Sequence, residues 1–142
     1  MNRSSLKVLI VDESYMGDVL LSTAGYREIA KHFPTCEVLT RPESKEVVEH
    51  SPIKRVHTSW KTIGRPDVAI HLHTSLKTNL KLMFKRIPVR IGYSYRWAGL
   101  PLTVKVPIPH RTIRKGYRVD EVCNLLEKAF GWTITNREMS WS

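Results

Sequence analysis

Three short segments of the sequence carry residue types that could bind or transform a ligand. The first, 12–18, reads Asp-Glu-Ser-Tyr-Met-Gly-Asp and lies between an apolar run and a helical pattern. Gly17 lets a ligand approach the backbone closely, and the free N–H groups of a helix N-terminus favour anions. Asp18 is either a carboxylate that faces a ligand or a helix N-cap or first-turn acid, which the helix dipole stabilises by about 0.3–1 kcal/mol. Neither the pattern GxGxxG nor a Walker A motif is present, so a dinucleotide site or a P-loop is not indicated.

The second segment, 71–77, reads His-Leu-His-Thr-Ser-Leu-Lys. His71 and His73 are two residues apart and share one face of a strand, so they could in principle share a metal ion. Because no third ligand follows at a fixed spacing, hydrogen-bonding or substrate-contacting histidines are favoured over a metal site. Ser75 at a helix N-terminus and Lys77 one turn later could hold an anion.

The third segment, 90–97, contains Arg90, Gly92, Tyr93 and Trp97. A glycine within a strand indicates a bulge or close approach of another backbone. Arginine, tyrosine and tryptophan together suit stacking on a sugar and pairing with an anion. A buried edge strand with its aromatic side chains packed inward accounts for the same residues, and both interpretations stay open.

Strand-like and helix-like patterns alternate along the chain and must position these segments. A nearly continuous apolar run predicts a strand buried on both faces at 7–11. Further strands are predicted at 37–39, 67–73, 89–93 and 102–106, and 55–57 is a candidate for a short one. Helical spacing and capping residues predict helices from Gly17 to before Pro34, at 42–49, from Ser75 to Pro88, and at 119–130 before Gly131. The alternation predicts a three-layer α/β domain with a mostly parallel sheet, in which ligands bind at the carboxyl ends of the strands.

The helix after Ser75 carries two contrasting sets of side chains. We expect its apolar side chains to form one buried face, made of Leu76, Leu80, Met83, Phe84 and Ile87. The other face carries the lysines Lys77, Lys81 and Lys85.

Length and composition indicate one globular domain over residues 1–142. The chain has 42% hydrophobic and 25% charged residues, which is ordinary for a globular protein. Cys36 and Cys123 form neither a metal-ligand spacing nor a disulfide framework. No apolar stretch approaches the roughly 20 residues of a membrane helix, and no signal peptide is recognisable, so we expect a cytoplasmic protein.

Positive charge is concentrated in one part of the sequence. The net charge is +10, and residues 54–118 contain 15 basic residues and a single acidic one, Asp67. A region this basic creates a field that can hold a phosphate, a carboxylated sugar, a nucleic acid or lipid headgroups. A merely solvated basic surface is the alternative.

The order and spacing of the three segments resemble the N-terminal half of glycosyltransferase family 9, which contains the ADP-heptose:lipopolysaccharide heptosyltransferases. The matching motifs are Ser-x-Met-Gly-Asp-Val-Leu-Leu at 14–21, Leu-His-x-Ser-Leu-Lys at 72–77 and Arg-Ile-Gly-Tyr at 90–93. The likeness runs from about Lys7 to Trp132 and implies the Rossmann-like, acceptor-side domain of a GT-B enzyme. The C-terminal nucleotide-sugar domain of that family is absent from the sequence, so the resemblance implies a chain that is inactive alone. Asp12, His71 and Thr74 depart from the residues common in the family.

The resemblance also implies roles for individual residues. Asp18 would be the general base that takes a proton from the acceptor hydroxyl during an inverting transfer of heptose or a related sugar. Substrate would be bound by Ser14, Met16, Gly17, His73, Ser75, Lys77, Arg90 and Tyr93. Basic residues, including the cluster at 111–118, would hold an anionic lipopolysaccharide-type acceptor. The donor would be an ADP-heptose-type nucleotide-sugar; the resemblance implies no metal or cofactor and is compatible with peripheral contact at the inner face of the membrane.

A second class of function fits the composition. Four tryptophans, five tyrosines and the net charge of +10 would suit a non-catalytic basic α/β module that binds nucleic acid or another polyanion. The order of the motifs favours the glycosyltransferase hypothesis and makes a nucleic-acid partner the less favoured one.

Overall fold

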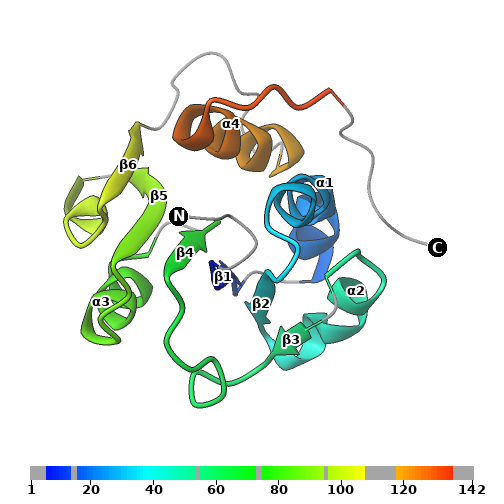
Figure 1. Ribbon diagram of the computed structural model, residues 1–142, viewed down its shortest axis with the longest axis horizontal. Helices are drawn as coiled ribbons and strands as arrows, with labels where there is room; N and C mark the ends of the chain where they lie inside the picture. Colours follow the sequence, from blue (N-terminus) through cyan, green and yellow to red (C-terminus); the bar gives the residue numbers. More distant parts are fainter. Residues whose placement is uncertain are drawn as a thin grey trace.

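The computed structural model describes residues 6–13, 16–53, 55–72, 75–94, 96–107 and 118–135. A six-stranded, fully parallel sheet with the order β3-β2-β1-β4-β5-β6 forms its centre (Figure 1). The strands are β1 (Val8–Asp12), β2 (Glu37–Thr40), β3 (Arg55–His57), β4 (Val68–His71), β5 (Val89–Ser94) and β6 (Val104–Pro107). The helices are α1 (Met16–His32), α2 (Lys45–Glu49), α3 (Leu76–Phe84) and α4 (Arg118–Phe130), with short 3-10 helices η2 (Pro42–Ser44) and η3 (Arg96–Gly99).

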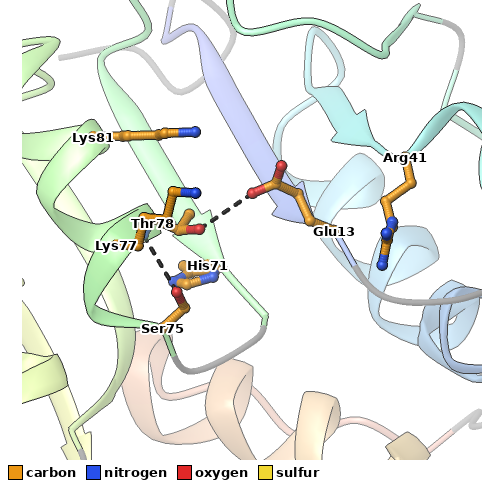
Figure 2. Close-up of a pocket in the computed structure, with 7 residues that line it drawn as sticks. All are labelled: Glu13, Arg41, His71, Ser75, Lys77, Thr78 and Lys81. Atoms are coloured by element: carbon orange, nitrogen blue, oxygen red, sulfur yellow. Dashed lines mark hydrogen bonds between the residues drawn. The ribbon is translucent and has the colours of Figure 1, made fainter.

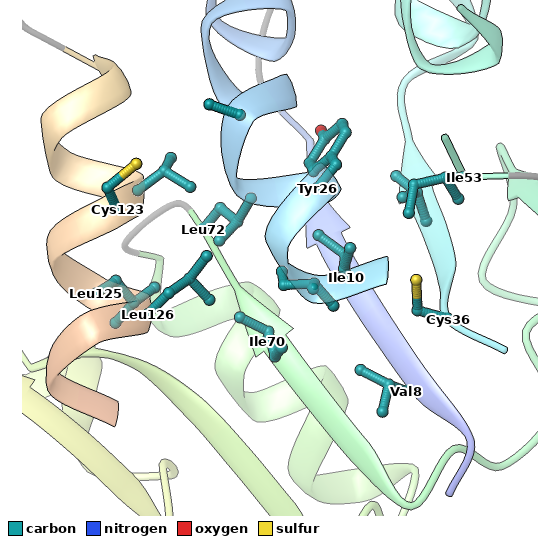
Figure 3. Packing of buried hydrophobic residues seen from close by; sticks show 14 of the residues in the cluster. Val8, Ile10, Tyr26, Cys36, Ile53, Ile70, Leu72, Cys123, Leu125 and Leu126 are labelled. Atoms are coloured by element: carbon teal, nitrogen blue, oxygen red, sulfur yellow. The ribbon is translucent and has the colours of Figure 1, made fainter. Parts of the chain in front are cut away.

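Both faces of the sheet are covered, which explains the continuous apolar run of β1. Val8 and Ile10 face a core formed with α1, α2 and α4 (Figure 3), whereas Leu9 and Val11 face a smaller core on the opposite side. Leu82 of α3 belongs to this second core. Because the successive side chains from Val8 to Val11 enter two cores, each of these four positions is apolar. The predicted three-layer, mostly parallel α/β architecture is therefore confirmed.

Capping residues determine where two of the helices begin and end. Ser75 is the N-cap of α3, and its side chain accepts a hydrogen bond from the Thr78 amide. Gly131 follows α4 with a φ of 74°, and its amide donates to the Glu127 carbonyl at 2.9 Å. A positive φ is accessible to glycine at little cost, which is why the helix ends there.

The predicted buried face of α3 is wrong. Leu76 is 39% exposed, Met83 36% and Phe84 75%, whereas the buried residues of the helix are Thr78, Asn79 and Leu82. The helix is turned so that Asn79 forms buried hydrogen bonds: its Nδ2 donates to the Ala98 carbonyl and its Oδ1 lies 2.6 Å from His71 Nδ1. Ile87, which the sequence placed on the same face, lies beyond the end of α3 and is buried.

Candidate functional site

A polar pocket of about 300 Å³ lies where β1, β2 and β4 end (Figure 2). It is lined by Glu13, Arg41, His71, Ser75, Lys77, Thr78 and Lys81. Glu13 directly follows β1, Arg41 follows β2, and His71 is the last residue of β4. In the sheet β1 lies between β2 and β4. The chain continues from β1 to β2 on one side and from β4 to β5 on the other, so it leaves β1 and β4 in opposite directions across the sheet. Open parallel sheets bind ligands at such a switch point.

Glu13 supplies the carboxylate of the pocket and is held by two hydrogen bonds. Its Oε1 accepts a hydrogen bond from Thr78 Oγ1 at 3.2 Å, and its Oε2 accepts one from Trp60 Nε1 at 3.4 Å. In Figure 2 the Glu13 side chain extends from the end of β1 toward Thr78 on α3. A carboxylate held in this way can still accept a hydrogen bond from a ligand hydroxyl, because its two oxygens offer about four acceptor positions.

Three cations surround this single carboxylate. Lys77 and Lys81 extend from one exposed side of α3, and Arg41 lies on the opposite wall. Arg41 also pairs with Glu43 at 3.1 Å, but both side chains are exposed, and such a pair is worth little. The lining therefore has an excess of positive charge and favours an anion that also carries hydroxyl groups.

His71 forms the buried floor of the pocket. Asn79 Nδ2 donates to the Ala98 carbonyl, so Asn79 Oδ1 is the acceptor and His71 Nδ1 the donor of the 2.6 Å hydrogen bond between them. This bond fixes the orientation of the ring relative to the start of α3. Within the described parts of the chain, no three His, Cys, Asp or Glu side chains are grouped so that they could hold a metal ion.

The structure describes only some of the residues that were predicted to form a site around 14–18. Asp18 is the third residue of α1 and is exposed, so it is a first-turn acid and not the N-cap, and it does not line the polar pocket. Met16 and Gly17 begin the same helix. Ser14 and His73 lie outside the described residues, as do 108–117, which include most of the basic cluster at 111–118.

Ser75 and Lys77 are the two predicted binding residues that the structure places in the pocket, whereas Arg90 and Tyr93 lie elsewhere. Arg90 Nε donates to the Pro101 carbonyl at 2.6 Å and its Nη1 to the Ile87 carbonyl at 2.7 Å. The Tyr93 hydroxyl donates to the Glu121 carbonyl and accepts a hydrogen bond from Asn124 Nδ2. These contacts connect β5 to its neighbours. The contacts of Tyr93 agree with the hypothesis that its side chain packs inward. However, β5 is not an edge strand, because β6 pairs with it.

Sequence reasoning missed four lining residues: Glu13, Arg41, Thr78 and Lys81, the last of which was expected only on the lysine face of its helix. Glu13 and Arg41 each directly follow a strand, which is the position from which parallel sheets present ligand-binding side chains. This position after a strand points to both residues: Glu13 lies within the segment 12–18, and Arg41 lies outside all three segments. Thr78 reaches the pocket because α3 turns this residue inward, and its pairing with Glu13 has no sequence signature.

Comparisons with known proteins bear on the fold. No family model matches the sequence, and neither does any curated protein. Among solved structures, heptosyltransferase WaaC of Escherichia coli with ADP superposes with a TM-score of 0.70 at 17% identity, covering 94% of this chain and 50% of that one. A family 9 glycosyltransferase from Veillonella parvula gives a TM-score of 0.75 at 18% identity, covering 99% of this chain and 44% of that one. For E. coli ADP-heptose lipopolysaccharide heptosyltransferase II the TM-score is 0.62 at 20% identity, with 73% of this chain and 35% of that one covered.

This chain thus spans half or less of the length of each of these proteins. At such low identity the superpositions show a similarity of fold alone. They confirm the Rossmann-like fold that the resemblance to glycosyltransferase family 9 implied: this chain has the α/β fold found within these glycosyltransferases.

Proposed function

We propose that this chain is the acceptor-binding domain of an inverting glycosyltransferase that transfers heptose or a related sugar to an anionic, lipopolysaccharide-type acceptor. The observation that carries the proposal is the polar pocket, in which Lys77, Lys81 and Arg41 surround the carboxylate of Glu13. Phosphate or carboxylate groups of the acceptor pair with the three cations. A sugar hydroxyl donates to Glu13, which Thr78 and Trp60 orient.

The proposed donor is a nucleotide-sugar of the ADP-heptose type. Two of the superposable structures are heptosyltransferase WaaC with ADP and with ADP-2-deoxy-2-fluoro heptose. In the proposed reaction the acceptor oxygen attacks the anomeric carbon, the bond to the diphosphate breaks, and the hydroxyl proton passes to Asp18 as general base. Asp18 is exposed near the start of α1. Both this helix and Glu13 follow the carboxyl end of β1.

We expect these 142 residues alone to bind acceptor without transferring sugar. Correct mutual positioning of two reactants accounts for about 7–11 kcal/mol of a barrier. The described residues offer a site for one of the two substrates, and the pocket at the switch point matches an acceptor with several anionic groups.

Calorimetric titration with a deacylated lipopolysaccharide inner-core oligosaccharide tests the proposal. We expect saturable binding, no binding of a neutral oligosaccharide of equal length, and roughly tenfold weaker binding by Lys77→Gln, because hydrogen bonds to charged groups contribute about 1.5–3 kcal/mol. Lys128→Gln is the matched control, since Lys128 is an exposed lysine on α4 and does not line the pocket.

The contrary result would be equal weakening by both substitutions together with preferential binding of a single-stranded oligonucleotide. That outcome would identify a general polyanion-binding module, because binding through total charge does not depend on which lysine is removed.

A further inference from the structure

All large hydrophobic side chains that are exposed among the described residues belong to one region. They are Leu76 (39% exposed), Met83 (36%) and Phe84 (75%) on α3, Trp97 (74%) in η3 and Leu100 (60%) directly after η3. Single exposed apolar residues are normal on a protein surface, but a cluster of them marks an interaction site. We call the region formed by the exposed sides of α3 and η3 the α3–η3 surface.

The two elements of this surface are held together by specific contacts. Asn79 Nδ2, on the buried side of α3, donates to the Ala98 carbonyl of η3 at 2.6 Å. Gly99 allows η3 to pack closely on β5, since a Cβ at this position would lie 2.8 Å from the Ser94 Cα. Helical spacing places Leu76, Leu80, Met83 and Phe84 on one side of α3. The elements that carry the exposed apolar side chains are therefore held in a fixed arrangement.

Charge distinguishes this surface from an ordinary protein interface. Lys77, Lys81 and Lys85 run along one side of the apolar stripe of α3, Arg86 follows the helix, and the sequence contains no acidic residue from 68 to 107. Lysine is depleted in protein–protein interfaces. Lysines beside exposed tryptophan, phenylalanine and leucine are typical of segments that lie in the interface of a bilayer with anionic lipids.

An apolar pocket of about 390 Å³ adjoins this surface. It is lined by Trp60, Lys81, Phe84 and Lys85. Lys85 Nζ donates to the Trp60 carbonyl at 2.8 Å, and Lys81 Nζ lies 5.2 Å from the centre of the Trp60 ring. The pocket thus combines apolar walls, which suit the acyl chains of a phospholipid, with ammonium groups, which suit its phosphate.

We propose that the α3–η3 surface docks this protein onto a bilayer that contains anionic lipids. Phe84 and Trp97, the most exposed of the apolar side chains, enter the interface, while the lysines of α3 contact the headgroups. No helix within the described parts of the chain is long and apolar enough to cross a membrane, and the contact proposed here is peripheral. The inference rests on exposure and charge and does not depend on the proposed sugar transfer.

Cosedimentation of the full chain with lipid vesicles tests the inference. We expect binding to phosphatidylcholine vesicles that contain about one-third phosphatidylglycerol, little binding to pure phosphatidylcholine, and release by salt. The double variant Phe84→Ser/Trp97→Ser should weaken binding at least about tenfold, because it removes the two largest side chains that enter the interface. Circular dichroism should show unchanged folding, since both side chains are exposed.

A matched pair of charge variants separates docking through this surface from attraction by total charge. Lys77→Gln should weaken vesicle binding about fivefold. Lys128→Gln removes the same charge on α4, which covers the opposite face of the sheet, and should change binding little. Equal effects of the two variants, or full binding by Phe84→Ser/Trp97→Ser, would overturn the inference.

Two further outcomes would also contradict it. Dimerisation that Phe84→Ser abolishes in analytical ultracentrifugation, without vesicle binding, would show that a second copy occupies the surface. Binding of an oligonucleotide that Trp97→Ser abolishes, again without vesicle binding, would show a nucleic-acid surface. In neither case would the oligosaccharide titration of the polar pocket be affected, so the two proposals fail separately.

Discussion

Lys81 and Trp60 form a cation–π pair, with the lysine Nζ 5.2 Å from the ring centre. Lys81 lines both the polar pocket and the apolar pocket beside Phe84, so this pair lies on the boundary between the two proposed binding surfaces. We expect Lys81→Arg to keep affinity for an anionic oligosaccharide within about twofold, because arginine also pairs with anions and stacks on indole rings. Lys81→Met should lower the affinity about tenfold in a calorimetric titration. Equal affinities of the two variants would contradict the placement of the anion beside α3.

Asp18 and Glu13 are predicted to differ in their effect on acceptor binding. Asp18→Asn should leave the affinity for acceptor unchanged and alter the free energy of unfolding by at most about 1 kcal/mol, the contribution of a first-turn acid. Glu13→Gln should weaken acceptor binding, since Glu13 lines the pocket and Asp18 does not. Titration and urea unfolding of both variants check this prediction. A larger loss of affinity in Asp18→Asn than in Glu13→Gln would show that the acceptor is held mainly at α1 and not in the polar pocket.

The close contact between α1 and α4 depends on Gly25. A Cβ at this position would overlap Val122 Cγ1 and lie 3.3 Å from Leu126 Cδ1. Alanine favours a helix interior over glycine by about 1 kcal/mol, whereas overpacking a core costs about 1–3 kcal/mol. We therefore expect Gly25→Ala to lower the free energy of unfolding, as measured by urea denaturation. Adding Val122→Ala should recover part of the loss, and strictly additive effects would show that the two sites do not touch.

Stability should fall at alkaline pH in part because of Cys36. Burial raises the pKa of its thiol from 9.0 to about 11. The folded state thus favours the neutral thiol, so this contribution to stability is complete below pH 9.0 and is lost as the pH rises through about 11. Urea unfolding across this range should show a steeper loss for the natural sequence than for Cys36→Ala. Identical slopes would indicate that the thiol is solvated in the folded protein.

Local sequence patterns predict most of the fold. Val8 to Val11 read as a strand buried on both faces because each side chain enters one of two cores. Ser75 and Gly131 mark helix boundaries through their own backbone and side-chain chemistry. Such signals act within a few residues, so they are visible in the sequence.

The orientation of α3 and the composition of the pocket depend on contacts between distant parts of the chain. Periodicity assigned Phe84 to the core, but Asn79 is buried instead because His71 and the Ala98 carbonyl provide its hydrogen-bond partners. Likewise, Glu13 and Thr78 are 65 residues apart and meet only through the order of the strands. A helix with apolar residues on more than one side does not reveal from its own sequence which side is buried.

The central position of β1 has a consequence for how the chain folds during synthesis. Of the six described strands β1 is made before the others, yet it pairs with β4, and Val8 aligns with Val68. After β2 has paired with it, the other edge of β1 exposes unsatisfied amide and carbonyl groups until translation has passed β4. Open strand edges recruit other chains, and pairings distant in sequence form slowly. Expression at lower temperature should therefore increase the yield of monomeric protein over aggregates, because the nascent edge is then exposed at a lower concentration of competing chains.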